Sequence, residues 1–100
     1  MFRKYINKLD KVLLDQKRFL LVTILYLFGP KLENELVKML NISWGTLHSH
    51  IDTLARKGYI LKRKVITDEG PRTLIEHTEK GLIKYRETVD CLRKIISTVS

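Results

Sequence analysis

The chain has 100 residues, a length that corresponds to one domain with a modest hydrophobic core. Its 19 Lys and Arg residues outnumber 11 Asp and Glu residues, so the formal charge is +8. Small, strongly basic folded domains most often bind a polyanion, and nucleic acid is the commonest. An anionic membrane surface, or a charge that serves only solubility, is the alternative explanation.

Cysteine content and hydropathy narrow the class of protein further. Cys91 is the single cysteine, which excludes an internal disulfide and fits a reducing compartment. The longest apolar run, residues 19–28, is too short to cross a bilayer. The N-terminus does not resemble a signal peptide. We therefore expect a cytoplasmic protein of one domain over residues 1–100.

Two helices are predicted at the start of the chain. Residues 2–14 have apolar residues in 3-4-3 spacing, which predicts a helix whose wide apolar stripe needs a partner surface. Residues 15–28 predict a second helix with Asp15 as its N-cap. Since residues 19–28 are apolar nearly all round, this helix is expected to be buried at the centre. Gly29-Pro30 ends it.

A helix-turn-helix is predicted over residues 32–57. The first helix, residues 32–40, turns its apolar side inward through Leu32, Leu36, Val37, Met39 and Leu40. A tight turn at Asn41-Ile42 leads to Ser43, a good N-cap for a helix over residues 43–57. Its inward side is formed by Leu47, Ile51 and Leu54, and Gly58 ends it.

The outward side of the 43–57 helix carries mostly short or hydrogen-bonding side chains. They are Trp44, Gly45, Thr46, His48, Ser49 and Asp52. A helix that lies on the floor of a DNA major groove needs close approach and mixed donors and acceptors. The alternative is an ordinary surface helix with a poor polar face.

Residues 59–77 are predicted to form a β-hairpin. Residues 59–66 and 72–77 are the two strands, and turn-forming residues occupy positions 67–71. The expected fold class is α+β, mainly α: a winged helix-turn-helix with a two-stranded wing and long terminal helices. Basic residues of the hairpin that could contact phosphate are Lys62, Lys64 and Arg72. A solvated edge strand is the alternative for the run Lys62, Arg63 and Lys64.

A last helix is predicted over residues 79–99, with Thr78 as its cap. Leu82, Tyr85, Val89, Leu92, Ile96 and Val99 recur in strict 3-4 spacing, as in the seam between two packed helices. We therefore expect a homodimer held by residues 1–14 and 79–99, although this helix could instead pack on its own core. The predicted interface consists of Phe2, Tyr5, Leu9, Val12, Leu82, Tyr85, Val89, Leu92 and Ile96.

This order of elements resembles the winged-helix transcriptional regulators of the MarR/ArsR/PadR type. The resemblance spans most of the chain and rests on Leu32-Glu-Asn-Glu-Leu36, Leu40-Asn-Ile-Ser43, Thr46-Leu47, His50-Ile-Asp-Thr-Leu54, Lys57-Gly58-Tyr59-Ile60, Glu69-Gly70-Pro71-Arg72 and Thr78-Glu79-Lys80-Gly81. It implies dimeric binding to double-stranded operator DNA, with the 43–57 helix in the major groove and the wing on the flanking backbone. The DNA-contacting residues would be Ser43, Trp44, Gly45, Thr46, His48, Ser49, Lys62, Lys64 and Arg72.

Two features depart from that family. His77 stands where an apolar residue usually precedes the Thr of the Thr-x-x-Gly motif, and the wing tip carries Asp68 and Glu69, which phosphate would repel. We therefore expect no deep insertion of the tip into a minor groove.

Other kinds of site find little support in the sequence. The histidines and Cys91 have no metal-ligand spacing, no Gly-rich phosphate loop is present, and no nucleophile has an evident activating partner. We expect no enzyme activity, no metal and no cofactor. A small-molecule effector at the dimer interface stays open. The alternative functions are a winged helix that binds protein without sequence-specific DNA binding, and a basic membrane-surface protein.

Overall fold

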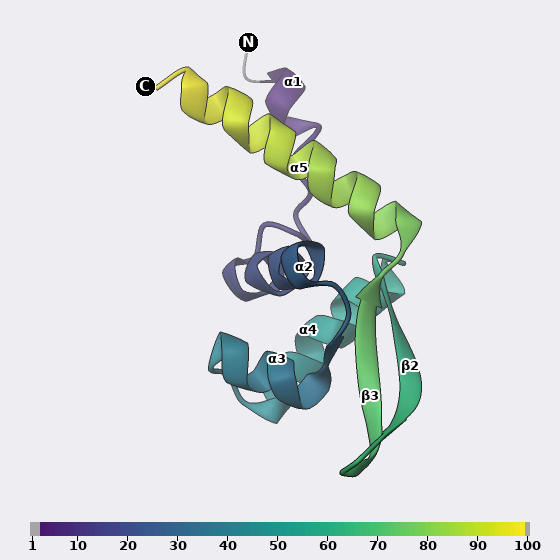
Figure 1. Ribbon diagram of the computed structural model, residues 1–100. Coiled ribbons are helices and arrows are strands. Elements are labelled where there is room, and N and C mark those ends of the chain that lie inside the picture. Colours follow the sequence, from purple (N-terminus) through teal and green to yellow (C-terminus); the bar gives the residue numbers. More distant parts are fainter. Residues whose placement is uncertain (1–2, 100) are drawn as a thin grey trace.

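The computed structural model describes residues 3–99, in which five helices and three short strands follow one another (Figure 1). They are α1 (Arg3–Ile6), α2 (Gln16–Phe28), β1 (Lys31–Leu32), α3 (Glu33–Leu40), α4 (Trp44–Arg56), β2 (Ile60–Thr67), β3 (Gly70–His77) and α5 (Glu79–Ser97). The molecule is elongated, 52 × 25 × 22 Å, because α5 extends away from the other elements (Figure 1). The predicted fold class is confirmed.

The N-terminal segment does not form the single helix predicted over residues 2–14. Only α1 is helical, and turns connect it to α2. The carboxylate of Asp10 accepts hydrogen bonds from the backbone N–H groups of Val12 (2.9 Å) and Leu13 (3.2 Å). Short polar side chains that bond to the backbone in this way compete with helical hydrogen bonds. Phe2, which was predicted to belong to this helix, lies outside the described residues.

Asp10 also ties this segment to the wing. The hydroxyl of Tyr59, directly before β2, donates a hydrogen bond to its carboxylate. Burial, and secondly the hydrogen bond to Asp10, raise the pKa of Tyr59. Leu13 is fully buried beside these groups in the core. Apolar residues of the segment therefore pack on the domain without a continuous helix.

The second helix, α2, begins as predicted. The carboxylate of Asp15 accepts hydrogen bonds from the backbone N–H groups of Lys17 and Arg18, both at 3.1 Å. Three residues bury one side of the helix: Leu21, Val22 and Leu25. The expectation that it is buried all round is wrong, because Leu20, Tyr26, Leu27 and Phe28 are exposed. Gly29 ends the helix at φ 79°, a conformation that costs glycine no Cβ clash.

The predicted helix-turn-helix is confirmed in α3 and α4. Asn41 takes a left-handed conformation between them, with φ 52°. The Ser43 hydroxyl accepts a hydrogen bond from the N–H of Thr46 at 3.1 Å and so caps α4. Met39 was predicted to face inward but is 47% exposed, since so short a helix buries only a narrow stripe. The buried residues of the motif are Leu36, Leu40, Leu47, Ile51 and Leu54.

The hairpin belongs to a three-stranded antiparallel sheet with strand order β1-β3-β2. The strands β2 and β3 pair from Ile60 and His77 to Thr67 and Gly70, so β3 starts earlier than predicted and β2 is shifted by one residue at the same length. The third strand, β1, was not predicted and pairs with β3 through its two residues. Two residues are too few to show the alternating pattern of a strand.

The last helix, α5, starts at the predicted cap, where the Thr78 hydroxyl accepts a hydrogen bond from the N–H of Gly81 at 3.0 Å. Its buried side consists of Gly81, Tyr85, Thr88 and Cys91. The prediction that Tyr85 lies in an interhelical seam needs correction, because its ring stacks on Phe19 of the same chain at 5.7 Å between centroids.

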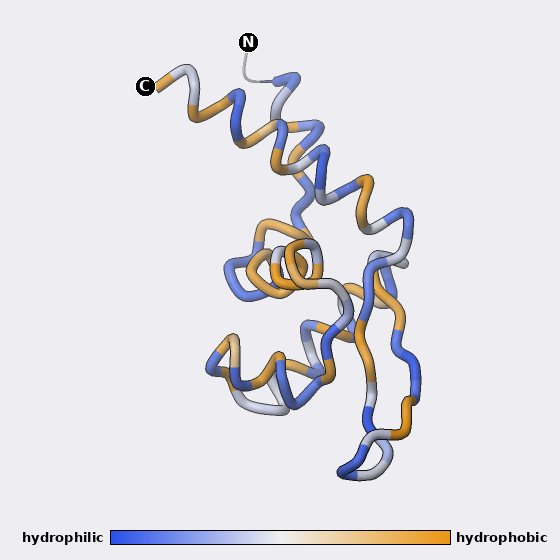
Figure 2. Tube along the Cα trace, in the orientation of Figure 1, coloured by the Kyte–Doolittle hydropathy of each residue, from blue (hydrophilic) through white to orange (hydrophobic). Residues whose placement is uncertain are grey.

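Hydrophobic positions recur along the whole of α5, including the half that extends beyond α2 (Figure 2). Of the other seam residues, Leu82, Val89 and Leu92 are half-buried, whereas Ile96 is 60% exposed. The short helix α1 lies beside this half of α5 (Figure 1), and the Cys91 thiol donates a hydrogen bond to the carbonyl of Tyr5 at 3.4 Å. Within residues 3–99, no helix combines the length and apolar character needed to span a membrane.

Candidate nucleic-acid interface

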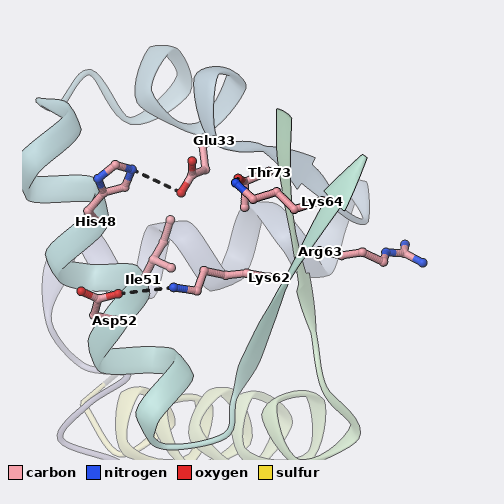
Figure 3. Close-up of a pocket in the computed structure, with 8 residues that line it drawn as sticks. All are labelled: Glu33, His48, Ile51, Asp52, Lys62, Arg63, Lys64 and Thr73. Atoms are coloured by element: carbon pink, nitrogen blue, oxygen red, sulfur yellow. Dashed lines mark hydrogen bonds and ion pairs between the residues drawn. The ribbon is translucent and has the colours of Figure 1, made fainter. Parts of the chain in front are cut away.

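A groove of about 390 Å³ lies between α4 and the hairpin (Figure 3). Residues from four elements line it: Glu33 of α3, His48, Ile51 and Asp52 of α4, Lys62, Arg63 and Lys64 of β2, and Thr73 of β3. The fold therefore brings His48, predicted on the 43–57 helix, and Lys62 and Lys64, predicted on the wing, along one groove.

Of the exposed residues predicted on α4, His48 and Asp52 line the groove. Trp44, Gly45, Thr46, His48 and Ser49 are all exposed, on the side of the helix away from the core. The Trp44 ring meets the His48 ring edge-on, at 5.8 Å between centroids. The Ser43 hydroxyl donates to the Thr46 hydroxyl oxygen at 2.9 Å, so these two side chains hold the start of the helix.

The opposite wall is formed by alternate residues of β2. Lys62 and Lys64 reach toward α4, whereas Arg63 points to the other side of the hairpin (Figure 3). The ammonium of Lys62 lies 3.6 Å from the Asp52 carboxylate, and that of Lys64 donates to the Thr73 hydroxyl at 3.0 Å. Two lysines thus border the exposed face of α4.

The structure does not bring Arg72 together with these lysines. In the register of the hairpin, Arg72 pairs with Val65, and paired residues share a face of the sheet, so Arg72 lies on the face opposite Lys62 and Lys64. Its guanidinium makes an ion pair with Glu69 at 3.7 Å. The Arg72 guanidinium is therefore already paired with an acidic residue of the wing tip.

Two acidic residues of the groove received little weight from the sequence. Asp52, on the outward side of α4, pairs with Lys62. Glu33 was not singled out, because an acid at a helix start is explained by the helix dipole. Its carboxylate lies 3.3 Å from Nε2 of His48. No sequence spacing signals a contact between separate helices of this kind.

The electrostatics of the groove are mixed. Two carboxylates, those of Glu33 and Asp52, line it together with two lysines, and these groups are substantially exposed except for Glu33. Exposed ion pairs contribute only about 0–1 kcal/mol to stability. Little free energy is therefore lost when Lys62 leaves Asp52 to bind a phosphate.

The second histidine of α4, His50, contacts α2 and does not line the groove. Nδ1 of His50 lies 3.3 Å from the Arg18 guanidinium of α2. His48 and His50 thus point to different sides of the helix. Nowhere in the described part of the chain do three or more His, Cys, Asp or Glu side chains gather to hold a metal ion.

Comparisons with known proteins identify the family to which this arrangement belongs. The family model of the winged helix DNA-binding domain matches residues 17–96. A solved transcriptional regulator homologue from Pyrococcus horikoshii OT3 is similar, with 26% sequence identity and a TM-score of 0.88. That match covers 97% of this chain and 98% of the other. Among curated proteins no match was found.

Two more distant structures share the fold. A PadR family transcriptional regulator from Eggerthella lenta DSM 2243 is 23% identical, with a TM-score of 0.66, over 87% of this chain and 84% of the other. A MarR-like transcriptional regulator from Thermotoga maritima is 19% identical, with a TM-score of 0.62, over 97% of this chain and 64% of the other. The family model spans most of the chain and includes both walls of the groove. The chain therefore belongs to the winged-helix DNA-binding domain family and has the fold of MarR-like transcriptional regulators.

Proposed function

We propose that this DNA-binding regulator recognises specific sequences in double-stranded DNA and acts as a homodimer. The observation that carries the proposal is the groove that His48 of α4 shares with Lys62 and Lys64, beside the exposed N-terminal side chains of α4. One wall offers groups that can hydrogen-bond to base edges, and the other offers cations for phosphates. Both are needed for sequence-specific binding, since phosphate contacts position a protein and base contacts specify the sequence.

The proposed mode of binding inserts α4 into the major groove. Helix-turn-helix proteins contact bases first with the N-terminal residues of the recognition helix. In this chain those residues are Trp44, Thr46, His48 and Ser49, which are exposed. Lys62 and Lys64 would contact the flanking backbone, and Gly45, without a side chain, allows close approach. We expect no deep contact by the tip, whose Asp68 and Glu69 repel phosphate.

The elongated shape supports the homodimer. Figure 1 shows that half of α5 extends beyond α2 and is flanked by α1, a helix of only one turn. Leu92 and Ile96 belong to this half, and their apolar surface is incompletely covered within the described chain. We propose that the same face of a second copy covers them, together with Leu82, Tyr5 and Leu9. We omit Val12, Val89 and Tyr85, because all three pack in or against the core of their own chain.

A selection of bound sequences from random duplex DNA tests the proposal with the full chain. We expect an inverted repeat, because a two-fold dimer presents two α4 helices, with half-sites centred about one helical turn apart. Binding without enrichment of any sequence would contradict sequence-specific recognition. If the chain does not bind duplex DNA at low salt, the protein-interaction function becomes the better explanation.

A further inference from the structure

Glu33 and His48 form a contact that joins the two helices of the helix-turn-helix. The Glu33 carboxylate lies 3.3 Å from Nε2 of His48, and their side chains are 18% and 54% exposed. An ionised carboxylate only accepts hydrogen bonds, so the proton in this contact belongs to Nε2. In the neutral imidazole the other nitrogen, Nδ1, is then an acceptor. Figure 3 shows Nε2 directed at Glu33 and the second ring nitrogen on the opposite side.

The position of Glu33 is well fixed. It is the first residue of α3, directly after β1, whose residues pair with β3. Its backbone is therefore held by the sheet on one side and by the helix on the other. The Trp44 ring meets the His48 ring edge-on and further restricts its rotation. A side chain held by such partners presents its free edge in one orientation.

We propose that Glu33 is a specificity-determining positioning residue, which holds His48 so that Nδ1 faces the DNA as a hydrogen-bond acceptor. This inference rests on the proposed function, with α4 in the major groove. The base donors in that groove are the N6 amino group of adenine and the N4 amino group of cytosine. Guanine and thymine present acceptors there. His48 therefore selects adenine or cytosine on the strand that it contacts.

Asp52 provides a matched control for Glu33. Both carboxylates line the same groove, but Asp52 pairs with Lys62 and not with a base-reading side chain. Removing either acid takes one negative charge from the phosphate-facing surface, so both changes raise affinity for all DNA sequences. Only the loss of Glu33 releases the His48 ring. Base discrimination at one position thus separates the positioning role from the effect of charge.

The test is competition binding of the full chain to single-base variants of the selected site. It is run at about pH 8, above the range in which an unperturbed histidine titrates. We expect His48→Ala to reduce discrimination at one position per half-site by about tenfold. Glu33→Ala reduces it at the same position, and adding Glu33→Ala to His48→Ala changes discrimination no further. Asp52→Ala leaves it intact.

Two outcomes overturn the proposal. One is full discrimination in Glu33→Ala, as in Asp52→Ala. The other is a preference for guanine or thymine at the position that His48→Ala relaxes. Nitrogen-15 NMR of the free protein reads the imidazole tautomer without DNA. It is expected to show Nε2–H in the wild type and a more mixed population in Glu33→Ala; Nδ1–H in the wild type also overturns the proposal. Absence of DNA binding would refute the proposed function and this inference together, and the NMR result would still show whether Glu33 fixes the imidazole tautomer.

Discussion

Nε2 of His77, at the end of β3, donates a hydrogen bond to the carbonyl of Val22 in α2 across 3.0 Å. The imidazole also lies beside the Tyr85 ring, at 6.1 Å between centroids. A polar ring therefore replaces the apolar residue that usually precedes the Thr-x-x-Gly motif, and it links the sheet to α2. Burial lowers the pKa of His77, although the hydrogen bond to Val22 acts in the opposite direction.

The lowered pKa of His77 predicts that the protein loses stability in mild acid. The unfolded chain takes up a proton on this residue before the folded chain does. The contribution to stability is therefore complete above the unfolded pKa, about 6.5, and is lost as the pH falls from there through the folded pKa. We expect the midpoint of thermal unfolding, followed by circular dichroism, to fall between about pH 7 and pH 5.

His77→Gln is the control for this prediction, because glutamine keeps a hydrogen-bond donor but does not titrate. The midpoint of thermal unfolding of this variant should depend less on pH in the same range. Asp15 does not interfere: its pKa is lowered from 3.8 by its hydrogen bond to the Arg18 N–H, so its contribution is lost only in stronger acid. An unchanged pH dependence in His77→Gln would rule out His77 as the cause.

Gly81 is expected to be the least replaceable glycine of the chain. A Cβ at this position would lie 2.0 Å from the carbonyl oxygen of Tyr59, because α5 starts directly on that backbone. Gly81→Ala must push α5 away from the sheet, which typically costs about 1–3 kcal/mol or more. Gly45, in α4, has no atom within 4 Å of its Cβ position, so Gly45→Ala should gain about 0.5–1 kcal/mol. Urea unfolding of both variants measures the contrast; equal stabilities would refute the close approach.

The homodimer predicts that charges on the exposed half of α5 produce monomers. Leu92→Glu with Ile96→Glu places two carboxylates on the proposed interface, and neither residue is fully buried in its own chain. Ile83→Glu is the matched control, because Ile83 is 50% exposed on another side of α5. Sedimentation at micromolar concentration should give a dimer for the wild type and for Ile83→Glu, and a monomer for the double variant. A monomeric wild type would contradict the proposal, and circular dichroism checks folding.

The sequence predicted those parts of the fold that depend on neighbours along the chain. The spacing of Leu47, Ile51 and Leu54 and the cap at Ser43 are sufficient to define α4. The break after α1 was missed because apolar spacing alone favoured a continuous helix, whereas Asp10 bonds to nearby backbone and to Tyr59, far along the chain. The pairing of Glu33 with His48 likewise depends on how two helices pack.

The length of the turn decides on which face of the sheet Arg72 lies. A turn over residues 67–71 would place Ile66 opposite Arg72, on the face of Lys64. The observed turn has only two residues between Thr67 and Gly70, so Val65 takes that place. A shift of one residue in register moves every side chain to the other face. The basic residues of the wing were thus identifiable from sequence, but their orientation depended on the turn.

This orientation leads to a prediction about the salt dependence of DNA binding. Each phosphate that the protein neutralises contributes about −0.9 to the slope of log K against log salt. Lys64 lies in the groove, where its ammonium donates a hydrogen bond to the Thr73 hydroxyl. Lys64→Ala should lower affinity for all sequences alike and flatten the slope by about one unit.

Arg63 is the matched control for Lys64, because it is the neighbouring cation on the same strand. It points to the other face and forms an ion pair with Glu76 at 3.4 Å. Arg63→Ala removes the same charge from the protein but should leave the slope nearly unchanged, since long-range charge effects between exposed groups are screened by salt. Fluorescence anisotropy on one DNA duplex over a salt series measures both variants. If Arg63→Ala flattens the slope as much as Lys64→Ala does, the wing contacts DNA through its other face. The groove between α4 and β2 would then not be the surface that lies on the phosphates.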